Sequence, residues 1–238
     1  MLPYKDLEAF VEVERLIVVA AHADDLETMC GGTIARLRQR GVTVFSVNCM
    51  LGDIGVQTAT VSRPALAQTR LTETEAAARI LSLEATYNLG QPDGELLPSL
   101  ELRAQIARLY RLTQADTLFT FDPFWSGQIH PDHRAAGQAA LDAYMPSKMP
   151  LYRPEQLNEV GAALGKLERI FCFGTEREPD IFIDVTEVYE TKLNASLAHV
   201  SQFPKGLDSL EWLKERDQQA GEAIAVTYAE SFNQIGVW

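Results

Sequence analysis

Apolar runs of strand length alternate with helical segments along this chain, and this alternation restricts the fold more than any other feature. Residues 15–22 (RLIVVAAH) and 42–51 (VTVFSVNCML) are apolar and rich in β-branched residues, as expected of parallel strands buried on both faces. Between them, Ile34 and Leu37 lie three residues apart and Gly41 is a suitable C-terminal stop, so a helix is predicted there. The three elements form a βαβ unit.

The same alternation continues along most of the chain. Helices are expected at about 64–82 and 99–114, and strands at 83–89, 117–123, 169–174 and 180–185. Thr186 is a suitable N-cap for the next helix, and a last helix is expected at about 209–231. We therefore predict one α/β domain over residues 1–238, with a Rossmann-like, doubly wound, mostly parallel sheet flanked by helices. The irregular stretch 146–167 is interpreted as an excursion on the substrate side.

The net charge of the chain argues against nucleic-acid and membrane partners, and its cysteines indicate the compartment. The chain has 33 Asp and Glu against 21 Lys and Arg, and its net charge of -12 repels nucleic-acid phosphates and anionic lipid headgroups. Three widely spaced cysteines within apolar runs are typical of free thiols in a reducing compartment. The N-terminal segment is too acidic for a signal peptide, and no apolar run approaches the ~20 residues of a membrane span. We expect a cytoplasmic protein without nucleic-acid or membrane partners.

The first polar segment follows the first predicted strand and contains His22, Asp24 and Asp25. In open α/β sheets, ligands bind beyond the carboxyl ends of the strands, so these side chains are well placed for chemistry. A dinucleotide-binding protein would instead carry glycines here, in the pattern G-x-G-x-x-G, so that the backbone could approach a pyrophosphate. Their absence disfavours nucleotide binding and predicts that side chains bind the ligand.

The second polar segment follows the strand expected at 117–123 and contains His130 and His133. Pro131 suits the first turn of a helix, and the three-residue spacing can turn both imidazoles toward one side, where one or both would meet a metal. Both polar segments should open on the same edge of the sheet. We therefore interpret the two segments together as a metal site.

The residue types of these two segments suit a catalytic Zn²⁺ with an open coordination position better than a structural zinc, which would favour cysteines. Zinc lowers the pKa of its bound water to about 7, and a nearby carboxylate can accept the proton as the hydroxide attacks a carbonyl. Asp24 and Asp25 are adjacent and point in different directions, so one can ligate while its neighbour acts as base. The residue types alone leave open which does which.

Residues 21–37 (AHADDLETMCGGTIARL) and 130–137 (HPDHRAAG) together resemble the PIG-L/LmbE-like family of zinc-dependent N-acetylglucosaminyl deacetylases. The hallmarks of that family are an A-H-P-D-D-type motif followed by G-G-T and, later, an H-P-D-H-type motif. The resemblance extends through 69–83, 89–96 and 179–203, which is most of the chain. It implies the LmbE-like deacetylase fold, one bound zinc, an amino-sugar substrate and assembly as a homo-oligomer.

The resemblance also implies roles for the two polar segments. His22, Asp25 and His133 would hold the zinc, which leaves Asp24 as the general base. His130 would stabilise the tetrahedral intermediate or protonate the leaving amine. Ala23 stands where the family usually has proline, which loosens the turn but removes no ligand. Gln128 stands where some members have a tyrosine near the oxyanion, and the glutamate usual after the aspartate pair is one place later, at Glu27.

Two further residues match sugar-binding positions of the family, Arg70 and Asp93. The alternative for Arg70 is an ion pair with Glu73 or Glu75 on the surface of its own helix. His199, the fourth histidine, is interpreted either as a helix-surface or interface residue or as part of the pocket rim.

The leading hypothesis is a zinc-dependent hydrolase that removes the N-acetyl group from an N-acetylglucosamine-type amino sugar or glycoconjugate. One alternative is a deacylase of a non-sugar N-acyl amide, since the motifs specify amide hydrolysis rather than the acyl acceptor. Another is a metal-binding protein without catalysis on the same fold. Loss of Asp24 or His130 would indicate that last class, and both residues are present.

Overall fold

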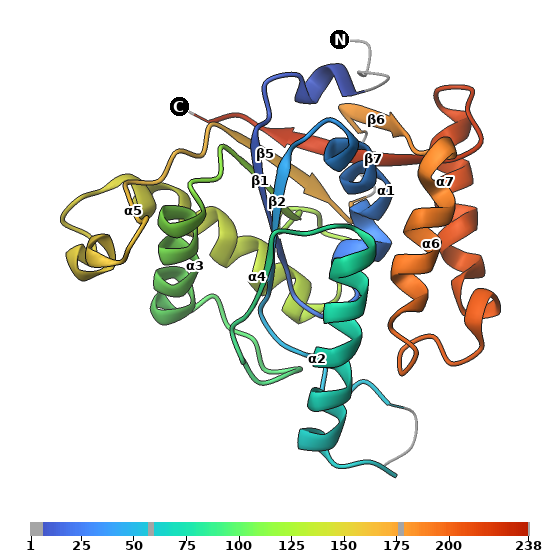
Figure 1. Cartoon of the computed structure of the whole chain (residues 1–238), viewed down its shortest axis with the longest axis horizontal. Coiled ribbons are helices and arrows are strands. Elements are labelled where there is room, and N and C mark those ends of the chain that lie inside the picture. The colour runs from blue at the N-terminus through green and yellow to red at the C-terminus, as the bar shows by residue number, and fades with distance from the viewer. Residues whose placement is uncertain (1–6, 57–59, 176–178, 238) are drawn as a thin grey trace.

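The strands of this protein join one sheet, in the order β3-β2-β1-β4-β5-β7-β6, within the residues that the computed structural model describes: 7–56, 60–175 and 179–237 (Figure 1). The strands are β1 Arg15–Ala20, β2 Thr43–Asn48, β3 Ala85–Asn88, β4 Thr117–Phe121, β5 Arg169–Phe173, β6 Ile181–Asp184 and β7 Ala229–Ile235. The first five run parallel, and β7 runs antiparallel to both of its neighbours, β5 and β6. The predicted doubly wound, mostly parallel sheet is confirmed.

Helices cover both faces of the sheet, with one group to its left and the other to its right in Figure 1. The first group is α3 Leu100–Thr113, α4 Pro131–Asp142 and α5 Tyr144–Lys148. The second group is α1 Asp25–Gln39, α2 Arg63–Ile80, α6 Tyr189–Leu197 and α7 Glu211–Glu222. Short 3-10 helices occupy Leu7–Phe10, Pro154–Asn158, Thr186–Val188 and Gly206–Leu210. The helices therefore bury the apolar strands from both sides, as the sequence predicts.

The order of the strands reverses at β1, and this reversal positions the functional site. From β1 the chain continues outward through β2 and β3, then crosses back on the other face so that β4 pairs with the free side of β1. Leu16, Ile17, Val18 and Val19 are completely buried at the centre of this arrangement. Ligands of such sheets bind where the strand order reverses, at the carboxyl ends of the two strands. Both polar segments of the sequence follow these ends.

The expectation of one helix at 209–231 is wrong. α7 ends at Glu222, and β7 follows as a strand inserted between β5 and β6. A Cβ on Gly221 would lie 2.6 Å from the carbonyl oxygen of Val226, so the returning chain passes directly against the end of the helix. Glu230 and Asn233 are buried within β7, and such polar residues hide the apolar alternation by which strands are recognised.

The segment 146–167 lies along α3, at the left of Figure 1. The buried guanidinium of Arg111, on α3, donates hydrogen bonds to five acceptors, which are the carbonyl oxygens of Pro146, Ser147, Met149 and Arg153 and the side chain of Gln156. Glu159 adds an ion pair with Arg108 on the same helix. The segment therefore packs along α3, and its expected position on the substrate side stays a prediction.

Two further predictions were that the cysteines are free thiols and that the chain has no membrane-spanning segment. Cys30, Cys49 and Cys172 are free thiols and are buried, as predicted. None of the helices in the described ranges is both long and apolar enough to cross a lipid bilayer.

Candidate metal centre

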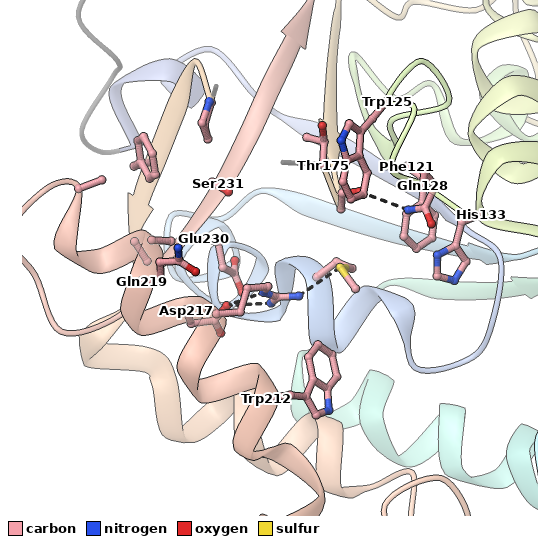
Figure 2. Close-up of a pocket in the computed structure, with 18 residues that line it drawn as sticks. Phe121, Trp125, Gln128, His133, Thr175, Trp212, Asp217, Gln219, Glu230 and Ser231 are labelled. Atoms are coloured by element: carbon pink, nitrogen blue, oxygen red, sulfur yellow. Dashed lines mark hydrogen bonds and ion pairs between the residues drawn. The ribbon is translucent and has the colours of Figure 1, made fainter. Parts of the chain in front are cut away.

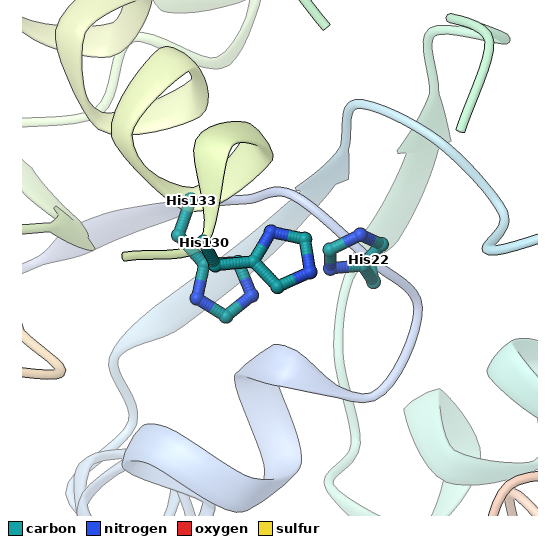
Figure 3. Close-up of side chains that lie close together, drawn as sticks. All are labelled: His22, His130 and His133. Carbon is teal, nitrogen blue, oxygen red and sulfur yellow. The ribbon is translucent and has the colours of Figure 1, made fainter. Parts of the chain in front are cut away.

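Three histidines from the two polar segments converge at the carboxyl ends of β1 and β4, and Figure 3 shows their rings side by side. His22 lies in the turn between β1 and α1, and His130 and His133 lie at the start of α4. One nitrogen of each imidazole lies within 4.8 Å of the other two. The predicted convergence of the two segments at one edge of the sheet is therefore found.

The beginning of α4 fixes the two histidines of the second segment. Pro131 is the first helical residue, in the first turn as the sequence predicts, and His130 is the N-cap residue, so His133 falls in the first turn. The His133 ring stacks on Phe121, the last residue of β4, with centroids 3.9 Å apart, and the His130 ring stacks on His133 at 4.2 Å. This stack, anchored on a buried strand residue, orients both imidazoles toward His22.

Asp25 lies between the two imidazoles expected to ligate with it. Its Oδ1 lies 3.4 Å from His133 Nε2, and its Oδ2 lies 3.4 Å from His22 Nδ1. Its Oδ2 also accepts a hydrogen bond of 2.7 Å from the backbone N–H of His22, which holds the turn closed. Burial favours the neutral acid, but the charges and hydrogen bonds of His133 and His22 outweigh it, so the pKa of Asp25 lies well below its usual range.

Asp24 has the opposite electrostatic environment, although it is adjacent in the chain. Burial and the neighbouring charge of Asp25 raise the pKa of Asp24 above the ordinary aspartate value, and His199 and His22 only partly offset this. One carboxylate is therefore held ionised between the imidazoles, while the other binds a proton more readily. The two adjacent aspartates therefore differ in proton affinity, and their roles as ligand and base stay a prediction.

Asp132 belongs to the same cluster, and sequence reasoning missed it as a site residue. Its buried Oδ2 lies 3.5 Å from His22 Nε2 and 3.9 Å from His130 Nδ1. Its two oxygens accept the backbone N–H groups of Gly94 and Leu96, which ties the loop after β3 to the start of α4. The signal was present in the sequence, because Asp132 is the acidic residue of the H-P-D-H motif.

Asp93 and Arg70 lie beside the cluster on the His22 side. Asp93 Oδ1 is 3.5 Å from His22 Nε2, and Asp93 Oδ2 accepts the backbone N–H of Ile54. The guanidinium of Arg70 is buried and donates to the carbonyl oxygen of Gly55 and to the side chain of Gln202. Asp93, His22 and Asp132 form a second group with metal-ligand spacing.

The alternative interpretation of Arg70, as a partner of Glu73 or Glu75, is wrong. The guanidinium turns inward to Gly55 and Gln202, and the Glu73 carboxylate accepts two hydrogen bonds of 2.7 Å from Ser201 instead. α2 is therefore fastened to the segment after α6 through both side chains.

His199 lies on that same segment and is neither a surface residue nor part of a rim. It is 1% exposed, and its Nε2 lies 3.4 Å from Oε2 of the buried Glu27. Burial lowers the pKa of His199, but the charges of Glu27 and Asp24 outweigh it and raise that pKa above the usual histidine value. The segment after α6 thus places the buried His199 imidazole against Glu27, in the first turn of α1.

The histidines of the cluster differ in proton affinity. Burial lowers the pKa of His22, but hydrogen bonds and charges from Asp25 and Asp93 outweigh it and raise that pKa to about 11. The pKa of His130 is lowered by burial and by the charges of His133 and His22. Without a metal, His22 therefore carries a proton near pH 7, whereas His130 is neutral.

A cavity of about 750 Å³ adjoins the cluster at His133 and extends between β7 and α7 (Figure 2). Its walls include aromatic and apolar side chains, amides and a paired cation, among them Met29, Trp125, Trp212, Gln219 and Arg216. Sequence reasoning did not place any part of α7 at the site, because this helix begins 78 residues after His133.

Comparisons with known proteins agree with this geometry. Residues 17–144 match the protein family described as PIG-L, GlcNAc-PI de-N-acetylase. The chain is 30% identical over 236 residues to a diacetylchitobiose deacetylase of Thermococcus kodakarensis, covering 98% of this chain and 88% of the relative. It is 29% identical over 208 residues to a probable N-acetyl-alpha-D-glucosaminyl L-malate deacetylase 2 of Bacillus cereus, covering 85% and 90%.

Comparison with solved structures also finds similarity to a deacetylase. The N,N'-diacetylchitobiose deacetylase of Pyrococcus horikoshii, determined with its inhibitor MPG, superposes with a TM-score of 0.88. The two sequences are 32% identical, and the superposition covers 97% of this chain and 87% of that one.

Proposed function

The chain belongs to the PIG-L family of GlcNAc-PI de-N-acetylases, and from this premise we propose that it is a zinc-dependent hydrolase that removes the N-acetyl group of an N-acetylglucosamine-containing glycoconjugate. The observation that carries the proposal is the convergence of His22, Asp25 and His133 beside a second aspartate with a raised pKa. That arrangement supplies both a metal site and a proton acceptor at one point.

The donor set fits zinc. Two imidazoles and one ionised carboxylate are three nitrogen and oxygen ligands, the number that a catalytic zinc uses while keeping a position open. We propose that His22, Asp25 and His133 hold the ion, as the family resemblance implies. Zinc bound there would polarise the amide carbonyl and lower the pKa of a water molecule to about 7. Asp132 and the Phe121 ring keep the imidazoles in position.

Two residues of the chain then take part in the reaction, Asp24 as a proton acceptor and His130 as a hydrogen-bond donor. The Asp24 carboxylate accepts a proton from the attacking water, and its raised pKa brings its proton affinity closer to that needed near neutral pH. His130, neutral at rest and 44% exposed at its side chain, donates its N–H to the carbonyl oxygen as negative charge develops there. The proton held by Asp24 then passes to the leaving amine nitrogen as the C–N bond breaks.

Arg70 and Asp93 are proposed to bind the sugar. Asp93 presents a carboxylate next to His22, and Arg70 presents a guanidinium beside the loop at Gly55, so both could hydrogen-bond hydroxyl groups of a sugar ring whose amide lies at the cluster. We further propose that the whole chain acts as one domain and, as the family resemblance implies, assembles as a homo-oligomer.

The test is release of free amine by the zinc-loaded protein, from a panel of N-acetylglucosamine-containing compounds and simple N-acyl amines. Asp24→Asn should keep its zinc and lose about 10²- to 10⁴-fold in kcat, since general-base catalysis contributes about that much. Zinc content by atomic absorption is the control. Undiminished turnover by the variant would refute the role of Asp24, and amine released only from non-sugar amides would refute the sugar substrate.

A further inference from the structure

The reaction centre has two sides, and the amide of the substrate faces both. On the His22 side lie Asp93 and Arg70, which are proposed to bind the sugar. On the other side the large cavity begins at His133, and neither Asp93 nor Arg70 lines it. The carbonyl carbon of an amide carries two substituents, the nitrogen with its sugar and the acyl group. With the nitrogen directed to the His22 side, the acyl group points toward the cavity.

The cavity is far larger than an acetyl group requires. The methyl of an acetyl group takes about the space of one water molecule, about 30 Å³. The cavity measures about 750 Å³ and extends from His133 to α7, where Trp212 and Ala220 line it. Pockets of this size enclose ligands as large as a typical drug molecule. A chain of several carbon atoms therefore has room beside the reaction centre.

The cavity wall begins with aromatic side chains. Phe121 lines the cavity and stacks on the His133 ring with centroids 3.9 Å apart. The Trp125 ring packs over Gly127, where a Cβ would lie 2.2 Å from it, so the turn itself holds this ring in place. Three further large apolar side chains line the cavity, Met29, Phe182 and Trp212 (Figure 2). Such a wall binds hydrocarbon by removing it from water.

The charged side chains that line the cavity are already paired. The Arg216 guanidinium makes an ion pair of 2.8 Å with Asp217. The Glu230 carboxylate makes an ion pair of 2.7 Å with the buried ammonium of Lys192. Among the described residues, no lysine or arginine of the cavity wall is left over for a carboxylate or phosphate. An uncharged ligand therefore fits the cavity best.

We propose that this cavity binds the acyl chain of the amide, and that the protein hydrolyses N-acylglucosamine units whose acyl group is a hydrocarbon chain longer than acetyl. Water adds to the carbonyl carbon and the C–N bond breaks. The products are a carboxylic acid, whose chain lies in the cavity, and the glucosamine amine, which takes up the proton. This inference rests on the proposed function and concerns the acyl group alone.

Amine release from glucosamines that carry acetyl, butanoyl, hexanoyl or octanoyl groups tests the proposal. Each fully buried methylene strengthens binding about fourfold, so even partial burial of the four added methylenes should favour hexanoyl over acetyl by at least about tenfold in kcat/KM. Calorimetric titration of the inactive, zinc-loaded Asp24→Asn protein should show the same preference as a lower Kd for N-hexanoylglucosamine.

A pair of variants tests whether the cavity is the source of the preference. Ala220→Phe adds a ring at the α7 wall and should bring the hexanoyl-to-acetyl ratio of kcat/KM down toward one. Gln218→Phe adds the same ring at an exposed position of the same helix, outside the cavity, and should keep the parent ratio. Because the ratio is taken within one protein, a partial loss of folded enzyme cancels out.

The outcomes separate this proposal from the proposed function. A kcat/KM that falls with chain length, with N-acetylglucosamine as the best substrate, would overturn the acyl site and leave the deacetylase standing. A parent ratio in Ala220→Phe would overturn the cavity as its location. If none of the compounds yields amine, the proposed function fails, and equal Kd values for the acetyl and hexanoyl compounds would then overturn the acyl site as well.

Discussion

At the scale of single residues, Asp132 shows how a side chain outside the expected ligand set can control the site. It is 1% exposed, lies 3.5 Å from His22 Nε2 and fastens the loop at Gly94 to α4. Asp132→Asn keeps the shape but removes the charge behind the His22 imidazole. Such partners of metal ligands typically contribute about 10- to 100-fold to metal affinity, so zinc binding should weaken by that factor.

Competition with a chelating dye measures this change. Asp142→Asn, at an exposed carboxylate on the same helix, is the control and should leave zinc affinity unchanged. An Asp132→Asn protein with the parent affinity would show that Asp132 only holds the loop.

The raised pKa of His22 predicts how the stability of the zinc-free protein depends on pH. Its pKa in the fold, about 11, lies above the 6.5 of an ordinary histidine, so folding strengthens its hold on the proton. The resulting stabilisation is fully present below about pH 6.5 and is lost as the pH rises toward about 11. Urea unfolding with a chelator present should therefore show stability falling over this range. His22→Gln should lack that component, and an identical pH dependence in both proteins would contradict the assignment.

At the scale of elements, a buried ionic cluster joins four parts of the fold around the cavity. Lys192 on α6 contacts Asp217 on α7 at 2.5 Å and Glu230 on β7 at 2.7 Å, and all three side chains are at most 1% exposed. Glu230 also accepts the N–H groups of Gly32 and Thr33 just after the kink of α1 at Cys30. The cluster thus fixes α7, with Trp212 and Arg216, relative to the rest of the cleft.

Lys192→Met should destabilise the protein by about 3–5 kcal/mol, because it leaves the buried Glu230 carboxylate without a cation and the buried Asp217 carboxylate with only the partly exposed Arg216. Chemical denaturation measures this loss. Lys214→Met, at a partly exposed lysine on α7 outside the cluster, provides the comparison and should change stability little. Losses of the same size in both variants would mean that the cluster is not a special source of stability.

How far the sequence predicts these elements depends on the periodicity of each. β1 and β2 are continuously apolar, and α3 has a clear apolar stripe, so their positions were predicted to within two or three residues. α1 begins at Asp25, several residues before the expected helix, because the kink at Cys30 joins two helical pieces. β7 escaped prediction because Glu230 and Asn233 are buried polar residues whose partners lie far away in the sequence.

At the scale of the whole molecule, the candidate ligands were predictable because they belong to local motifs, whereas their surroundings were not. His22 and Asp25 lie in the turn after β1 and at the start of α1, His133 lies in the first turn of the helix after β4, and the sheet brings the three together. The cavity depends on α7 and β7, and the placement of Arg70 depends on Gln202, both of which come from distant parts of the chain. Spacing along the sequence carries no information about such contacts.

Zinc should stabilise the whole fold, because its proposed ligands come from both sides of the β1–β4 pairing. At a free zinc concentration of about 1,000 times Kd, an ion that binds only the folded state adds about 4 kcal/mol to the free energy of unfolding. Calorimetry with and without a chelator should show the corresponding rise in Tm. His133→Ala should abolish most of the zinc-dependent increment, and an increment of the parent size in that variant would exclude this ligand.

The reversal of strand order at β1 has a consequence for how the protein is made. β1 leaves the ribosome well before its partner β4 and the histidines of α4, which follow about a hundred residues later. A nascent chain that ends before His133 holds only part of the proposed ligand set. Metal loading is thus expected to be a late event of biosynthesis, and chains stalled before α4 should emerge without tightly bound zinc.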